Sequence, residues 1–316
     1  MNKALLFFYC LFISASAFAT HNIGGAIYYK YLGNNQYEIT AYNYQDVTQV
    51  SQYLTLDVSG ASVSFLTLTY AGSTEINIAC NIPLYTYKFV GILSLPPQQS
   101  SDVVLSYGTC CRLPNMTNLN STPGMLIKTV IHPNVAQLVN NSAPQQYISK
   151  RFSYTQDSIV TINAFVEDDN ISDSVFIDFT APLDNNVILP MSYAQNYSAT
   201  QPFGTATPTF INNRTGVITV LNPQQGMYTV ALKITSFING TAIGETHWDF
   251  IVHISSTIDP VISWNEINFT GTQATYHNNN ATYITAEFDT LEIAVNGQAG
   301  LTDSLTLRAF GQKLQG

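Results

Sequence analysis

Apolar and polar residues alternate along most of the chain with a period of two, which is typical of half-buried β-strands. In residues 228–234, Tyr, Val, Leu and Ile take every second position. The alternation returns at Phe250, Val252 and Ile254. No stretch combines an apolar stripe at helical spacing with capping residues. The pattern therefore predicts an all-β protein.

Turn-forming residues separate the alternating stretches. Gly33-Asn34-Asn35 lies between residues 27–31 and 37–44, and Gly and Asn accept the positive φ angles of tight hairpins. Asn239-Gly240 is a second strong turn sequence. Short strands with regularly spaced turns are typical of β-sandwiches, and we expect several of them in tandem.

The N-terminus has the features of an export signal. Lys3 precedes an apolar run over residues 4–14, and Ala17-Phe18-Ala19 has the form of a signal-peptidase site. The alternative is a membrane anchor, but the run is shorter than the roughly 20 residues that span a bilayer. We expect residues 1–19 to be a cleaved signal peptide and the mature chain to be secreted or exposed at the cell surface. No later apolar run is long enough for a transmembrane helix.

Turn-rich sequences at residues 140–144 and 255–260 divide the mature chain. They predict an N-terminal sandwich over 20–140, a second over 141–257 and a third module over 258–316. A seven-stranded sandwich usually needs about 100 residues, and the third segment is much shorter. We therefore expect the third module to be incomplete and the chain to be a fragment of a longer protein.

Composition excludes several classes of protein. Charged residues make up only 10% of the 316 residues, against a usual value of about 25%, so a coiled coil or helical bundle is excluded. The net charge of −9, with no basic patch, argues against a nucleic-acid partner. The five histidines are dispersed, and the chain lacks the motifs of hydrolases, zinc proteases and nucleotide-binding enzymes. We expect no enzymatic activity.

Three cysteines remain after the signal peptide: Cys80, Cys110 and Cys111. An exported protein can retain a disulfide. Adjacent cysteines bridge each other only through a strained ring, so Cys80 is expected to pair with Cys110 or with Cys111. The sequence leaves the choice between these two open.

Short motifs in order along the chain resemble one family of large secreted proteins of Bacteroidetes. The matching residues are His21, Gly24-Gly25, Leu32-Gly33, Tyr37, Cys80, Pro83, Leu95-Pro96-Pro97, Cys110-Cys111-Arg112, Asn118, Thr215-Gly216, Gly226, Tyr228, Asn239-Gly240, Ile243-Gly244 and Asp249-Phe250. Ala26 stands where the family has Glu, and the family's gliding-motility-associated C-terminal sorting domain is absent. The resemblance implies immunoglobulin-, cadherin- or PKD-like modules.

A calcium site is one candidate that this resemblance raises. The acidic loop 167–173 is similar to a cadherin calcium loop, with Asp169 and Asp173 at its ends and Glu167 and Asp168 beside them. Calcium prefers six to eight oxygen ligands, several of them carboxylates. The alternative is a solvated hairpin loop without calcium. We expect no other cofactor.

O-glycosylation is a second candidate. The triplet Asp-Ser/Thr-apolar is the pattern that the resemblance implies for this modification. It occurs at Ser158, Ser174, Thr290 and Ser304. The alternative is that these triplets simply begin strands.

The sequence thus predicts a non-catalytic adhesion or structural segment whose partner is an extracellular protein or glycan. The alternative is a carbohydrate-binding accessory module, since the chain has 19 Tyr and 17 Phe residues and aromatic rings can stack on sugars. A coplanar row of exposed Tyr or Trp side chains on one sheet face would favour this alternative.

Overall fold

The computed structural model describes residues 22–46, 50–78, 82–120, 124–133, 145–146, 153–164, 166–167, 174–185, 189–256, 274–277 and 280–283. The elements in these residues are β-strands, which confirms the all-β prediction. No helix within them is long and apolar enough to cross a membrane. The chain divides into two compact units, Met1–Thr257 and Ile258–Gly316.

The strands of the first unit fall into an early and a late group. The early strands are β1 (Asn22–Gly33), β2 (Gln36–Gln45), β3 (Tyr53–Ser59), β4 (Phe65–Ile78), β5 (Ile82–Ser94), β6 (Val103–Thr109) and β7 (Met125–Ile131). The late strands are β8 (Gln145–Gln146), β9 (Ser153–Thr155), β10 (Ile159–Asn163), β11 (Val166–Glu167), β12 (Ser174–Thr180), β13 (Thr209–Ile211), β14 (Val217–Leu221), β15 (Gly226–Ile238) and β16 (Thr241–Ser255). In the second unit, β17 (Ala274–His277) pairs with β18 (Asn280–Tyr283).

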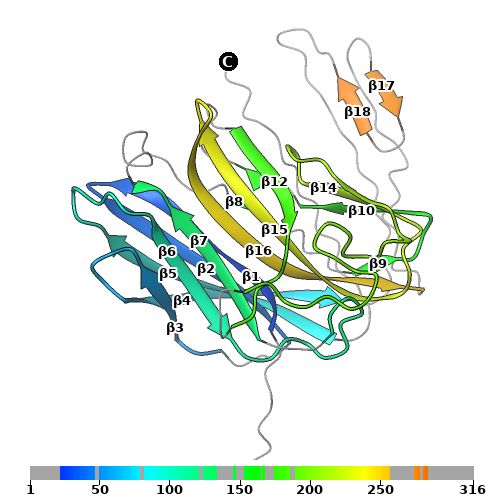
Figure 1. Cartoon of the computed structure of the whole chain (residues 1–316), viewed down its shortest axis with the longest axis horizontal. Helices are drawn as coiled ribbons and strands as arrows, with labels where there is room; N and C mark the ends of the chain where they lie inside the picture. The colour runs from blue at the N-terminus through cyan, green and yellow to red at the C-terminus, as the bar shows by residue number, and fades with distance from the viewer. Residues whose placement is uncertain are drawn as a thin grey trace, which may run out of the picture. The chain divides into compact units, whose positions relative to one another are not determined.

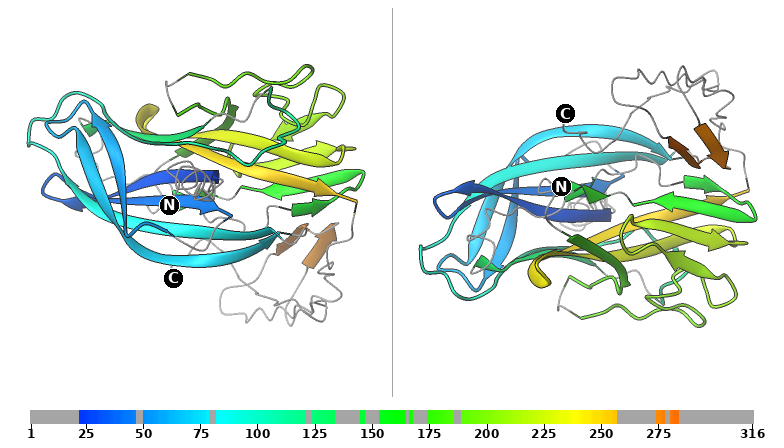
Figure 2. Two further views of the ribbon diagram at one scale, coloured as in Figure 1. Left: turned by 90° about the horizontal axis from the view of Figure 1, so that it is seen from below. Right: turned by 90° about the horizontal axis from the view of Figure 1, so that it is seen from above.

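Most strands of the first unit belong to one large sheet (Figure 1). Its order is β1-β2-β5-β4-β3-β6-β7-β16-β15-β12, and β9 pairs with the end of β16. A further pairing joins β1 to β16 at Gly25 and Asp249. The strands from β1 to β16 in this order therefore form a closed ring. In Figure 2, blue β1 and β2 lie between the cyan strands and the yellow β15 and β16.

Both predicted hairpins are confirmed. Asn34 and Asn35 join β1 to β2 with φ values of 50° and 59°. Asn239 and Gly240 join β15 to β16 with φ values of 50° and 79°. The left-handed conformation matches the right-handed twist of the paired strands, which explains why Asn and Gly occupy these positions.

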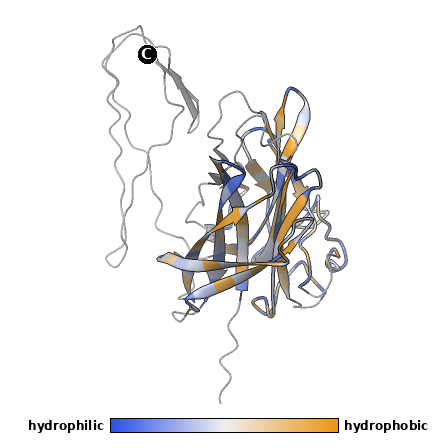
Figure 3. Cartoon of the chain, turned by 90° about the vertical axis from the view of Figure 1, so that its left-hand side faces the viewer, coloured by the Kyte–Doolittle hydropathy of each residue, from blue (hydrophilic) through white to orange (hydrophobic). Residues whose placement is uncertain are grey.

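Two hydrophobic cores fill the first unit. One core lies inside the ring and includes Tyr29, Ile39, Leu56, Phe89, Leu105 and Ile127. The other joins β12, β15 and β16 to the small sheet β10-β14-β13, and includes Tyr228, Leu232, Trp248, Phe250, Val160 and Ile218. Figure 3 shows both apolar and polar residues along the strands of the first unit. The alternation itself is clearest in β3, where every second side chain is buried.

Strand β16 is shared by both parts of this unit. It pairs with β7 at residues 244–247, with β1 at Asp249, with β15 along most of its length and with β9 near its end. Regions 20–140 and 141–257 were predicted as separate sandwiches, but strands from both lie in one sheet. The physical reason is length, since a 15-residue strand is about 50 Å long and can pair with different neighbours along its course.

The paired glycines near the N-terminus allow β1 to approach both of its neighbours, β16 at Gly24 and β2 at Gly25. A Cβ atom on Gly24 would overlap the carbonyl oxygen of Asp249, and one on Gly25 would crowd the backbone of Tyr42. The Gly-Gly motif therefore has a structural explanation: the ring closes where two backbones lie too close for side chains.

Replacing Gly24 with alanine is expected to destabilise the fold by about 2–3 kcal/mol, because one backbone must move to make room. Gly72→Ala is the matched control. Gly72 has a φ of 134° and open space around its Cβ position, so only conformational strain of about 1 kcal/mol is expected. Urea unfolding measures both variants. Equal costs would contradict the proposed close approach.

Candidate functional site

A buried ion pair lies where β1, β16 and the segment after β6 meet. Arg112 Nη1 and Nη2 donate to Asp249 Oδ1 and Oδ2 over 2.8 and 2.6 Å, and neither side chain is exposed. Two further N–H groups of Arg112 bond to the carbonyls of Gly124, at 3.1 Å, and Leu183, at 3.4 Å. The bidentate geometry and these extra bonds satisfy a buried guanidinium, which would otherwise be very costly to desolvate.

The pair connects segments that are distant in sequence. Arg112 follows β6, Asp249 lies in the middle of β16, and Leu183 belongs to the segment that follows β12. Burial raises the pKa of the nearby Tyr193 phenol, and the negative charge of Asp249 raises it further. Because every donor of Arg112 named here is used internally, the pair is a structural clamp.

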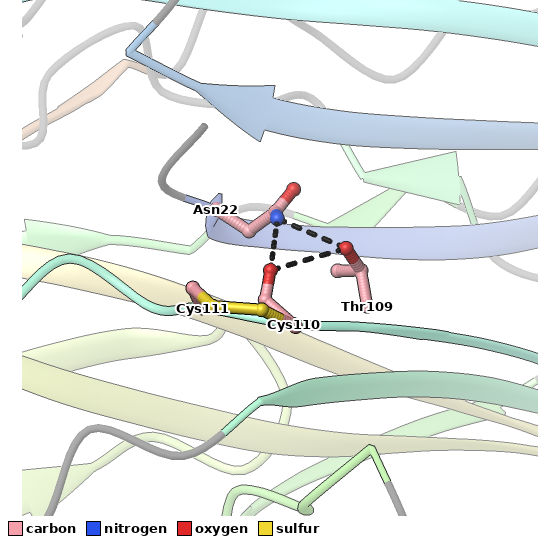
Figure 4. Close-up of a disulfide and its surroundings, with 4 residues drawn as sticks. All are labelled: Asn22, Thr109, Cys110 and Cys111. Atoms are coloured by element: carbon pink, nitrogen blue, oxygen red, sulfur yellow. Dashed lines mark hydrogen bonds between the residues drawn. A yellow bond between two sulfur atoms is a disulfide. The ribbon is translucent and has the colours of Figure 1, made fainter. Parts of the chain in front are cut away.

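Cys110 and Cys111 form a disulfide with each other beside this clamp (Figure 4). Asn22 fixes the turn: its side-chain amide donates to Cys110 O at 3.0 Å and to Thr109 Oγ1 at 3.1 Å, and its backbone N–H donates to Cys111 O. This pairing differs from the predicted bridge to Cys80, which lies outside the described residues. Adjacent cysteines can bridge only where the backbone turns between them, and here Cys111 has a φ of 82° in the turn that Asn22 holds.

Peptide mapping under non-reducing conditions tests the disulfide. Trypsin cuts after Lys88 and Arg112, so both adjacent cysteines fall in peptide 89–112 and Cys80 falls in peptide 31–88. We expect peptide 89–112 to appear alone, lighter by two hydrogen atoms than its reduced form. Recovery of the two peptides cross-linked to each other would support the Cys80 pairing instead.

A pocket of about 90 Å³ lies on the sheet face formed by β7, β16 and β15. Lys128 and Lys233 lie directly opposite His247 on the two neighbouring strands, so the three side chains form one cross-strand row. Glu245 lines the pocket as well, 4.0 Å from the ammonium of Lys233. Thr180 and Leu183, from the end of β12 and the following segment, complete the wall.

His247 is neutral near pH 7. Burial lowers its pKa, and the positive charges of Lys128 and Arg112 lower it further, against the opposing effects of Asp249 and of a hydrogen bond to the Ala181 carbonyl. The carbonyl of Ala181 accepts from Nε2 at 3.1 Å, which places the proton of the neutral ring on Nε2. Nδ1 is then a hydrogen-bond acceptor.

Stability is expected to fall as the pH drops below about 6.5, the ordinary pKa of histidine. The folded pKa of His247 lies below that value, so the unfolded chain binds the proton more readily in this range and unfolding becomes easier. Urea midpoints at pH 7.5 and pH 5 measure the effect. His247→Gln should reduce the difference, and an unchanged difference would show that other groups cause it.

A serine and a histidine lie together on β9 and β16. Ser153 Oγ is 3.0 Å from His253 Nδ1, at a register position where the two strands pair in parallel. Such a contact can activate a nucleophile, which must also be accessible to substrate. Ser153 is buried, with 4% of its surface exposed, so this contact fits a role in attaching β9 to the sheet.

Most residues predicted as sites lie elsewhere. Asp168, Asp169 and Asp173 fall outside the described residues, and of Glu167 only the backbone is described, in β11. The described residues contain no cluster of three or more His, Cys, Asp or Glu side chains suited to a metal ion.

The predicted O-glycosylation sites are half described. Ser158 and Ser174 are exposed, immediately before β10 and at the start of β12. Thr290 and Ser304 are outside the described residues, as is the predicted signal peptide 1–19.

The residues that define the pocket and the clamp were not among the predicted site residues. Asp249 and Arg112 were matched to family motifs without a role, and His247 was counted only among dispersed histidines. One available signal was that Glu245, His247 and Asp249 occupy alternate positions in an apolar strand, which places three ionisable side chains on one face. Comparisons with family models, curated proteins and solved structures found no match to this chain.

Proposed function

We propose that the protein is a non-catalytic, exported adhesion or structural segment, built from modules related to immunoglobulin- and cadherin-like sandwiches. The observation that carries this proposal is that β16 pairs with strands whose side chains belong to two different cores. A strand that pairs with β1, β7, β9 and β15 ties distant parts of the chain into one continuous unit. Such a unit suits a protein that has to transmit force or hold a surface in a fixed shape.

Buried polar side chains support the same proposal, because they hold irregular segments against strands. Asn118 donates to the carbonyls of Pro202 and Thr229 at 3.0 and 2.8 Å and accepts from the Thr229 N–H at 3.0 Å. Arg112 acts in the same way through Gly124 and Leu183. The hydrogen-bonding groups of these side chains already bond to other parts of the protein. A catalytic group, in contrast, has to face a substrate.

Localisation and phenotype in the source cells test the proposal. We expect antibody against the mature chain to label intact cells or the medium, and deletion of the gene to reduce attachment or surface integrity. Re-expression of the wild-type chain should restore the phenotype. Re-expression of Arg214→Met, a change at an exposed turn residue, should restore the phenotype equally. Retention of the protein inside the cells, or turnover of an added substrate by the pure chain, would contradict the proposal.

A carbohydrate-binding role is the second candidate, favoured by two exposed aromatic residues. Tyr53 on β3 and Phe65 on β4 are 62% and 66% exposed. They flank the Thr55–Thr67 pair on the outer face of two adjacent strands. They do not form a row of stacked Tyr or Trp rings. A glycan array with wild type and Tyr53→Ala tests this role, with Phe210→Ala, an exposed aromatic on β13, as the control. Binding that depends on Tyr53 and not on Phe210 would favour it.

A further inference from the structure

The disulfide between Cys110 and Cys111 lies at the surface, next to the buried start of β1. Cys110 is exposed and Cys111 is half-buried, whereas Asn22, the first residue of β1, is completely buried. An external thiol can therefore approach Cys110 from solvent. Exposed disulfides are the ones that thiols reduce most readily.

Asn22 attaches β1 to this disulfide turn through four hydrogen bonds. Its backbone N–H donates to the carbonyl of Cys111 at 3.0 Å, and its carbonyl accepts from the N–H of Leu113 at 3.3 Å. Its side-chain amide donates to Cys110 O and to Thr109 Oγ1 at 3.0 and 3.1 Å (Figure 4). Two of these bonds end on carbonyls of the bridged cysteines, so the position of Asn22 depends on the shape of the turn.

The shape of the turn depends in its own right on the disulfide. Cys111 has a φ of 82°, in the left-handed region that a residue with a side chain occupies only where its surroundings hold it. The bond between the two sulfur atoms supplies such a restraint. Once this bond is broken, Cys111 is free to return to a negative φ, and that rotation turns the Cys110 carbonyl away from Asn22.

The pairing of β1 with β2 gives little further support at this end. Asn22 pairs with Gln45 and Gly24 with Tyr44, so the register shifts by one residue between them. Such an irregularity disrupts the hydrogen-bond ladder locally. The ion pair of Arg112 with Asp249 is buried and involves no sulfur, so it remains when the disulfide is reduced. Loss of the disulfide therefore releases the start of β1 and leaves the ring closed.

We propose that the Cys110–Cys111 disulfide is a redox-sensitive latch, which holds the start of β1 in the fold and which an external dithiol opens. The latch does not rest on the proposed role as an adhesion or structural segment.

Opening takes two thiol–disulfide exchanges. In the first, one thiolate of the dithiol attacks the sulfur of Cys110, the bond to Cys111 breaks, and the sulfur of Cys111 leaves as a thiolate and takes up a proton. In the second, the other thiolate of the dithiol attacks the mixed disulfide, and the sulfur of Cys110 leaves in the same way. The protein gains two electrons and two protons, and the dithiol becomes a disulfide.

Hydrogen exchange of the purified chain, followed by NMR with and without dithiothreitol, tests the proposal. Reduction should add two hydrogen atoms to peptide 89–112. It should speed the exchange of the Asn22 and Leu113 amides about tenfold, because both donate across the released contact. Amides of β10 and β14, in the separate small sheet, should keep their rates. Oxidised dithiothreitol should restore slow exchange.

Two variants assign the effect to the adjacent cysteines. The double variant Cys110→Ser/Cys111→Ser should show fast exchange at Asn22 and Leu113 without dithiothreitol and no response to it. Cys80→Ser keeps the adjacent pair and is the matched control, so it should respond as the wild type does. If the double variant does not fold, the reversible response of Cys80→Ser decides.

Three results would overturn the proposal. The first is a disulfide that dithiothreitol reduces only in the unfolded chain. The second is complete reduction that changes the exchange of Asn22 and Leu113 by less than about twofold. The third is an equal acceleration in β10 and β14, which would indicate general unfolding in place of a local release.

Discussion

Replacing Arg112 with methionine is expected to lower the free energy of unfolding by about 3–5 kcal/mol, because the change leaves the carboxylate of Asp249 buried without its partner. The carbonyls of Gly124 and Leu183 lose a donor at the same time. Equilibrium unfolding in urea, followed by circular dichroism, measures the loss. If the variant is unfolded in buffer, added sulfate or sucrose brings it into the measurable range.

Two further variants separate the loss of charge pairing from the loss of packing. In the double variant Arg112→Met/Asp249→Leu, the buried charge is gone, so it should be clearly more stable than Arg112→Met alone. Arg214→Met, in an exposed turn, should change stability by less than about 0.5 kcal/mol. A double variant that is no better than the single one would refute the explanation by an unpaired buried charge.

Truncating a large side chain in either core is expected to destabilise the whole first unit by about 3–5 kcal/mol. Trp248, which stacks on Phe250 with ring centroids 4.0 Å apart, represents one core, and Phe89 represents the other. Strand β16 pairs with early strands (β1 and β7) and with a late strand (β15). Trp248→Ala and Phe89→Ala should therefore each lower the midpoint of a single unfolding transition of the whole first unit.

Two measurements show whether the first unit unfolds in one transition or in two. Near-ultraviolet circular dichroism reports on the aromatic packing, and hydrogen exchange reports on amides of β4 and β15 separately. Coincident midpoints in both variants are the expected result. Two separated transitions, with each variant moving only one, would indicate independent modules that divide near residue 140. Ile92→Ala, at an exposed position on β5, is the control and should change little.

Local features of the fold could be predicted from the sequence because they depend on neighbouring residues. The alternation in residues 228–234 correctly places β15, and the Asn-Gly turn at 239–240 correctly ends it. The hairpin at Asn34 and Asn35 is correct for the same reason, since left-handed turn conformations favour Asn and Gly wherever they occur.

The candidate site could not be predicted in the same way, because its residues come from four distant segments. Lys128, Lys233 and His247 are unremarkable in sequence and become a row only through the register of three strands. The disulfide is a related case. The expected bridge to Cys80 was based on the geometry of isolated cysteine pairs, whereas in the structure the turn held by Asn22 joins Cys110 to Cys111.

The all-β class and the two tight hairpins follow from the amino-acid sequence alone, since strand periodicity and turn chemistry act over a few residues. The closure of the ring by β16 against β1 and β7, and its pairing with β15 of the other core, emerge only from the folded chain. The meeting of Arg112 and Asp249 in the interior likewise emerges only there. The physical reason is that strand partners are chosen by backbone hydrogen bonds, which every residue except proline can make, so the sequence carries little information about which distant strands will pair.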